Sequence, residues 1–103
     1  MTLESLSGEH WRDELRKGTQ AIEKLCEDLE ITVEELDDET ISYLQSENVL
    51  KPNELGLSVE KENLKEYVTI LDAELRILNS STLKFNLLPG EDFGYIIITP
   101  LIN

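Results

Sequence analysis

A chain of 103 residues is long enough for one domain with one core, and we assign 1–103 to a single domain. Its 22 acidic and 9 basic side chains give a net charge of −13 at pH 7, and a field of this sign repels nucleic acid phosphates and anionic membranes while it attracts basic protein surfaces. The composition therefore argues against direct nucleic acid or membrane binding, and the lone Cys26 excludes a disulfide within the chain.

The first helix is predicted over 9–29. Its apolar residues are spaced four and three apart, as on one face of a helix: Trp11, Leu15, Gly18, Ile22, Leu25 and Leu29. We expect Ser7 to be its N-cap and Gly18 to permit close approach of a neighbouring element. The preceding segment 1–7 is expected to be flexible. It lacks the basic start and apolar run of a secretory signal, so we expect a cytoplasmic protein.

A second helix is predicted to begin at Thr32. Thr32 and Glu35 have the spacing of a capping box, in which each side chain satisfies a backbone N–H near the other residue. Ile31 and Leu36 fit the hydrophobic staple that accompanies such a box. The pattern therefore favours helix immediately after the first one.

Asp37 or Asp38 could instead cap a separate short helix, and this alternative stays open. That helix would reach about Glu47 and would carry the apolar residues Ile41 and Leu44. Both versions make 8–50 an acidic helical part, and both end before Pro52 because proline cannot continue a helix.

The remaining sequence predicts a turn, a third helix and a hairpin. Residues 51–56 have turn chemistry, and a helix is predicted over 57–79, with Ser58 as its N-cap. Its apolar stripe consists of Leu64, Val68, Leu71, Leu75 and Leu78. Over 82–100, two alternating or β-branched runs flank a Pro-Gly turn and predict a β-hairpin whose last strand is covered or paired on both sides. The expected class is α+β, with three to four N-terminal and central helices packed on a C-terminal two-stranded hairpin.

Residues 25–36 resemble the centre of a helix-turn-helix of the phage-repressor type. Cys26 stands at the small position of the first helix, Thr32 at the cap of the recognition helix, and Glu30 where that family has glycine. The resemblance implies a helical hairpin here. The would-be recognition helix carries carboxylates where a DNA reader needs cations, so we expect such a surface to contact protein.

We call residues 25–50 the acidic segment, because it contains nine carboxylates and no Lys or Arg. If it were largely helical, its charges would recur every ~3–4 Å, close to the phosphate spacing of one DNA strand. We therefore expect a non-catalytic inhibitor or modulator that presents this face to a basic partner such as a nucleic acid-binding protein, as a DNA mimic or an immunity protein would. The residues predicted to bind the partner are Glu27, Asp28, Glu30, Glu34, Glu35, Asp37, Asp38, Glu39 and Tyr43.

Catalytic and metal chemistry find little support in the sequence. His10 and Cys26 have no neighbouring partner in a catalytic pattern, and Cys26 beside Leu25 is typical of a small core residue. Asp37-Asp38-Glu39 lacks the ligand spacing and glycine of a calcium loop. We therefore predict no catalytic residue, no metal site and no cofactor.

Two alternatives to partner inhibition stay open. In one, the protein is a structural or assembly subunit that joins a complex through its helical stripes or its final strand, and its acidity serves only solubility. In the other, the stripes form a seam between two copies, which would make a homodimer. We favour packing of the stripes within one chain, because a small domain needs that surface for its own core.

Overall fold

The computed structural model describes residues 11–101. Within this range lie three α-helices, one 3-10 helix and four strands, which confirms the α+β class but adds two strands to the expected hairpin. In chain order the elements are α2 (Trp11–Asp28), β1 (Thr32–Glu35), α3 (Asp38–Ser46), β2 (Leu55–Glu60), η2 (Leu64–Tyr67), α4 (Val68–Leu78), β3 (Leu83–Leu88) and β4 (Phe93–Pro100). The flexible segment predicted over 1–7, the cap Ser7 and His10 lie outside the described residues.

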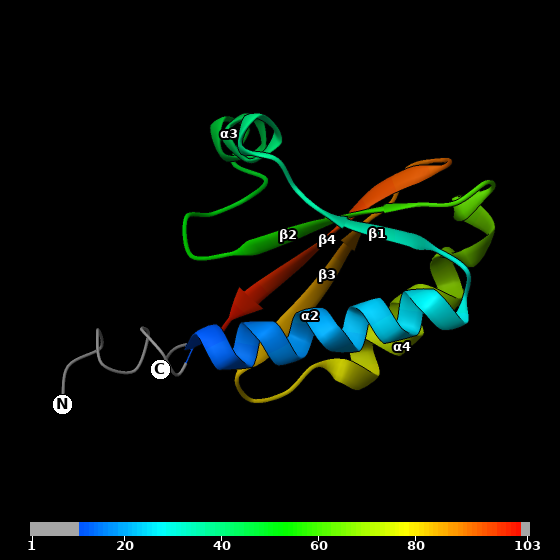
Figure 1. The fold of residues 1–103 in the computed structure, drawn as a ribbon, viewed down its shortest axis with the longest axis horizontal. Coiled ribbons are helices and arrows are strands. Elements are labelled where there is room, and N and C mark those ends of the chain that lie inside the picture. The colour runs from blue at the N-terminus through cyan, green and yellow to red at the C-terminus, as the bar shows by residue number, and fades with distance from the viewer. Residues whose placement is uncertain (1–10, 102–103) are drawn as a thin grey trace, which may run out of the picture.

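The strands form one antiparallel sheet in the order β1-β2-β4-β3 (Figure 1). The hairpin predicted over 82–100 is present as β3 and β4. β4 is a central strand, since its Ile96 lies between Leu57 of β2 and Leu87 of β3. Of the two alternatives expected for the last strand, pairing is confirmed, because β4 is hydrogen-bonded to a strand along each edge.

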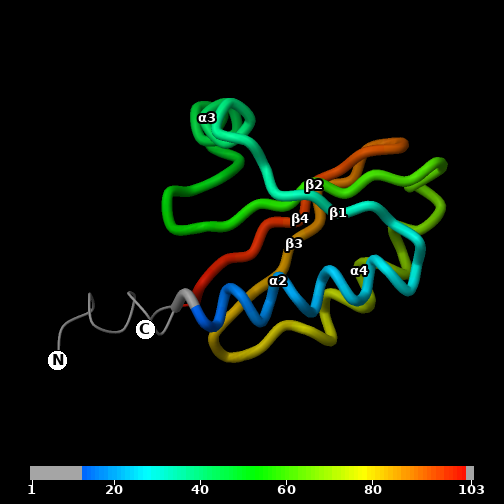
Figure 2. Tube along the Cα trace, viewed as in Figure 1, coloured from blue at the N-terminus to red at the C-terminus, as the bar shows by residue number. Residues whose placement is uncertain are grey.

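Helices α2 and α4 lie together on one face of the sheet, and α3 lies on the other (Figures 1 and 2). The main core fills the space between the sheet, α2 and α4 and includes Ile22, Cys26, Leu57, Val59, Leu64, Leu71, Leu75, Leu83, Phe85, Ile96 and Ile98. A smaller cluster beneath α3 consists of Leu44, Leu50 and Ile97. Because α3 has only nine residues, it covers only part of its face.

The predicted first helix is confirmed as α2. From Leu15 on, its apolar stripe packs in or against the main core, and Gly18 lies close to β3. A Cβ atom at Gly18 would lie 3.0 Å from Leu83 Cδ1 and 3.3 Å from Phe85 Cζ. Glycine therefore permits this approach, as the sequence indicated.

The helix predicted to begin at Thr32 is wrong, because residues 32–35 form β1. Helix α2 ends in a left-handed residue, Glu30, with φ 60°. The Ile31 N–H donates to the Cys26 carbonyl at 2.7 Å and the Glu30 N–H to the Glu27 carbonyl at 3.1 Å, which is the Schellman pattern of a helix C-terminus. The chain then leaves in extended form, so no helix-turn-helix exists here.

The separate short helix is confirmed as α3, and Asp37 is its cap. The Thr40 N–H donates to Asp37 Oδ1 at 2.7 Å, and this hydrogen bond satisfies one of the N–H groups that have no partner inside the helix. The acidic part predicted over 8–50 is thus helix, strand and helix in turn. Thr32 and Glu35 have the spacing of a capping box, but they lie in β1 and no helix begins at Thr32.

The helix predicted over 57–79 is partly wrong. Residues 55–60 form β2, and helix begins only at Leu64. Ser58 lies within the strand, and its hydroxyl donates to the Glu34 carbonyl of β1 at 3.4 Å instead of capping a helix. The predicted stripe is correct from there on, since Leu64, Leu71 and Leu75 are buried in the main core.

Candidate functional site

The nine carboxylates of the acidic segment do not share one helical face. Glu27 and Asp28 lie in the last turn of α2, Glu30 in the turn, and the others on β1, α3 and its C-terminus: Glu34, Glu35, Asp37, Asp38, Glu39 and Glu47. All are solvent-exposed. The regular charge spacing of one continuous helix is therefore absent, although the segment remains an exposed acidic surface.

On β1, Glu34 and Glu35 point to opposite faces of the sheet, because strand side chains alternate. Glu35 lines a hollow on the α2 side together with Leu15, Arg16, Thr19 and Leu55. Glu34 lies on the α3 side. Of the sequence-predicted site residues, the structure brings Glu34, α3 and the exposed Tyr43 to one side of the sheet and leaves Glu27 and Asp28 at the end of α2.

The exposed carboxylates have few cationic neighbours. Among the side chains described here, ion pairs join Asp13 to Arg16 and Glu14 to Lys17, both within α2. The acidic segment contributes to neither of them. Hydrogen bonds from the Thr40 side chain and backbone hold the pKa of Asp37 below its usual value, so that this carboxylate stays ionised.

The sheet face under α3 is only half covered. Around Ile97, the side chains of Leu44 and Leu50 close it. Toward the tip of the β3–β4 hairpin it is open, and we call that part the open half-face. Strand register and side-chain alternation place seven residues on it: Thr32, Glu34, Ser58, Glu60, Leu88, Phe93 and Tyr95.

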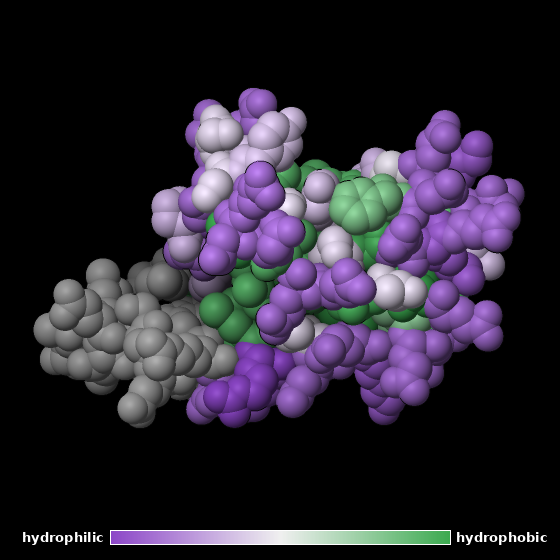
Figure 3. Space-filling model, turned by 45° about the horizontal axis from the view of Figure 1, so that its top comes forward, coloured by the Kyte–Doolittle hydropathy of each residue, from purple (hydrophilic) through white to green (hydrophobic). Residues whose placement is uncertain are grey.

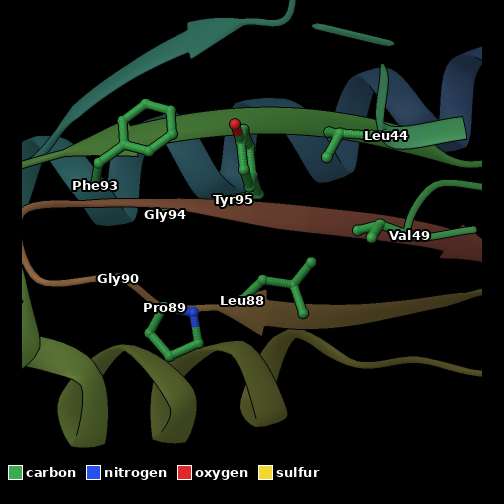
Figure 4. A pocket seen from close by; sticks show the side chains of 8 residues that line it. All are labelled: Leu44, Val49, Leu88, Pro89, Gly90, Phe93, Gly94 and Tyr95. Carbon is green, nitrogen blue, oxygen red and sulfur yellow. The ribbon is translucent and has the colours of Figure 1, made fainter. Parts of the chain in front are cut away.

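An apolar groove of about 420 Å³ lies on the open half-face beside α3. It is lined by Leu44, Val49, Leu88, Pro89, Gly90, Phe93, Gly94 and Tyr95. Figure 4 shows the Phe93 and Tyr95 rings rising from β4, with Leu88 and Pro89 along one side and Leu44 and Val49 toward one end. In Figure 3, apolar surface shows between the hydrophilic surfaces of α3 and of the opposite end of the sheet.

Two aromatic rings of β4 lie in contact within this groove. The ring centroids of Phe93 and Tyr95 are 5.0 Å apart and the rings are inclined at 85°, an edge-to-face arrangement that fixes both orientations. Phe93 is 45% exposed and Val49 38% exposed. Two large apolar side chains that stay this accessible within one groove are typical of a surface that another molecule covers.

The lining of the groove is almost entirely apolar. It offers the Tyr95 hydroxyl and otherwise apolar side chains and backbone. The chain's one thiol lies elsewhere, in the core, where burial raises the pKa of Cys26 to about 11, so it is protonated and unreactive at neutral pH. In residues 11–101, His, Cys, Asp and Glu side chains do not gather in groups of three or more that could hold a metal ion.

Sequence reasoning missed most of the groove. Leu44 is one of the apolar residues of the short helix predicted after Asp37, but no pattern in the sequence indicates that Val49 lies beside the strand residues of the groove. A signal was present, however. Phe93 and Tyr95 alternate with Gly94 and Ile96, which places both aromatic residues on the face opposite the main core.

No helix in residues 11–101 is both long and apolar enough to cross a bilayer. The chain matches no protein-family model, no curated protein and no solved structure.

Proposed function

We propose that the protein is a non-catalytic binding protein that presents the acidic segment to a basic surface of a protein partner. Its most concrete form is an inhibitor or modulator of a nucleic acid-handling protein, since such proteins carry cationic grooves that an acidic surface can occupy. The net charge of −13 and the exposure of the carboxylates support this proposal.

One observation carries the proposal: the acidic segment also supplies apolar anchors. Helix α3 and the loop after it contribute Leu44 and Val49 to the apolar groove, while Asp38 and Glu39 at the start of the same helix are exposed. Charges at the rim of an interface speed encounter and set salt sensitivity, whereas buried apolar anchors carry most of the affinity. A merely solubilising charge run has no need of an adjoining apolar groove.

The assembly alternative has to use different surfaces from those the sequence indicated. The helical stripes are buried, since Leu71 is fully inaccessible, and β4 is paired along both edges. A specific observation still favours this alternative: α4 exposes Ile70 at 48% and Ile77 at 75% on its outer side. Assembly or dimerisation through α4 is therefore the second candidate.

A charge-neutralisation experiment tests the proposed function. The test variant carries Glu34→Gln, Glu35→Gln, Asp38→Asn and Glu39→Gln, and it keeps Asp37 so that the α3 cap survives. A control variant loses the same number of charges from exposed sites elsewhere through Glu23→Gln, Glu62→Gln, Glu66→Gln and Glu74→Gln. Both variants change net charge equally, so any difference between them reports position.

The immobilised proteins are compared for capture of basic proteins from a lysate at low and raised salt. We expect the test variant to lose about tenfold or more of the salt-sensitive capture and the control variant to keep it. Equal capture by both variants would refute a role for the acidic segment. A change in mass caused by Ile77→Ser alone, seen by sedimentation, would favour assembly through α4.

A further inference from the structure

The open half-face is divided into an acidic side and an apolar side. On β1 and β2 it carries Glu34 and Glu60, both exposed, with Ser58 between them. On β4 and β3 it carries Tyr95, Phe93 and Leu88, which line the apolar groove. In register, Glu60 lies opposite Phe93, and Glu34, Ser58, Tyr95 and Leu88 form one row across the sheet.

Charge on this surface has one sign. In the described strands, the one cation on the α3 side of the sheet is Lys84. It lies outside the open half-face, at the far end of β3 in register with Thr99. The turn at the other end adds Glu91 and Asp92, both exposed. An occupant of the groove therefore meets carboxylates on its flank and no strand cation beside it.

The sheet is wide enough to carry two helices side by side on each face. Four strands at ~4.8 Å spacing make a sheet ~19 Å wide, and a helix with its side chains is ~10 Å across. On the other face two helices, α2 and α4, cover the sheet, whereas on this face α3 covers only the end around Ile97. This face therefore carries less helical cover than a three-layer arrangement would provide, and the space beside α3 can accept a helix.

Resting on the proposed function, we infer that the open half-face binds an amphipathic basic helix of the partner protein. The apolar stripe of that helix packs on Phe93, Tyr95 and Val49, and lysine or arginine side chains along its flank approach Glu34 and Glu60. A second copy of this chain does not meet these requirements. The same half-face of a second copy offers carboxylates and no strand cation to Glu34 and Glu60, so charge complementarity is lacking.

Synthetic peptides of leucine and lysine provide the probe. One, of about 14 residues, has leucine at helical spacing, and the other alternates leucine and lysine as a strand does. The backbone amide spectrum of the full chain is recorded by NMR as each peptide is added at low and raised salt. The protein variants are Phe93→Ala, the charge-neutral pair Glu34→Gln with Glu60→Gln, and the control Ile77→Ala, which removes an even more exposed apolar side chain from α4.

We expect the helical peptide to shift the amides of Val49, Phe93 and Tyr95. Phe93→Ala should weaken its binding about tenfold, the Glu34 and Glu60 pair should reduce the salt dependence, and Ile77→Ala should change the affinity less than about twofold. Circular dichroism of each variant verifies that the fold is retained.

Three outcomes would overturn the inference. If both peptides shift only the amides around Asp37–Glu39, the acidic segment binds cations but the open half-face does not bind a helix. If neither peptide binds at low salt, the proposed function falls with the inference. If the protein sediments as a dimer that Phe93→Ala dissociates, the occupant is a second copy.

Discussion

Replacing Glu30 by glycine is expected to stabilise the protein. Glu30 has φ 60° at the end of α2, and a left-handed backbone costs an L-residue with a Cβ about 1–2 kcal/mol. Glycine avoids this cost but loses about 0.5–1 kcal/mol of additional backbone entropy on folding. The Glu30 N–H donates to the Glu27 carbonyl, and Lys61 Nζ donates to the Glu30 carbonyl. Both hydrogen bonds use backbone atoms of residue 30, so they persist in the variant.

The net gain for Glu30→Gly is thus about 0.5–1 kcal/mol, or about 2–5 °C in Tm for a domain of this size. Thermal and urea unfolding followed by circular dichroism measure it. Glu30→Gln removes the same charge but keeps the Cβ, so it should gain little. Asn48→Gly is a matched control, because Asn48 has φ 59° at the end of α3 and asparagine already tolerates that conformation.

Two results would refute this reasoning. If Glu30→Gln raised Tm as much as Glu30→Gly, relief of charge repulsion rather than of backbone conformation would be responsible. If Glu30→Gly lowered Tm, the glutamate side chain would have to stabilise the turn by more than its backbone conformation costs.

The other predictions concern the core, the thiol and the α3 cap. Gly18→Val should lower the free energy of unfolding by about 1–3 kcal/mol in urea titrations, because its side chain would overlap Leu83. Cys26, with its pKa raised to about 11, should resist iodoacetamide at neutral pH in the folded protein and react once urea unfolds it. Asp37, whose folded pKa is lowered, should stabilise the fold above its unfolded pKa of about 3.9 and lose that contribution as pH falls through the lower folded value. The difference in Tm between the parent and Asp37→Asn, which keeps a cap without titrating, should therefore shrink in acid.

Local sequence patterns were sufficient to predict an element when all the residues that specify it lie within that element. Helix α2 has an uninterrupted stripe ending near Leu29, and the β3–β4 hairpin has alternation on both sides of Pro89-Gly90. The Asp37 cap was also visible, as the alternative to a helix from Thr32. In each case the signal and the structure occupy the same few residues.

The strands β1 and β2 could not be assigned in this way, because tertiary pairing decides them. Thr32 and Glu35 have the spacing of a capping box, but burial of Val33 opposite Val59 in the sheet stabilises the extended chain instead. For β2, Gly56 and Ser58 suggested a turn and a cap, although Leu55, Leu57 and Val59 alternate with them. Capping-box and turn rules consider only nearby residues, and β2 is stabilised by β4, far along the chain.

The groove was the least predictable feature. Its lining comes from α3, the loop after it, β3 and β4, and no local pattern joins Val49 to Phe93. What the sequence does contain is the excess of aromatic and aliphatic residues on both faces of β4. On one face of β4 the helices α2 and α4 cover these residues. On the other face α3 covers Ile97, while Phe93 and Tyr95 line the groove.

The central position of β4 also bears on the order of folding. β2 and β3 are joined in the sheet only through β4, and Leu55 pairs with Ile98 across a long loop. The entropy of closing that loop must be met before the pairing contributes stability. A nascent chain that has emerged only as far as α4 lacks the strand that unites its sheet. We therefore expect the helices to form transiently on their own, and the β1–β2 pair, α2 and α4 to become stable together, in one cooperative step, when β4 inserts between β2 and β3.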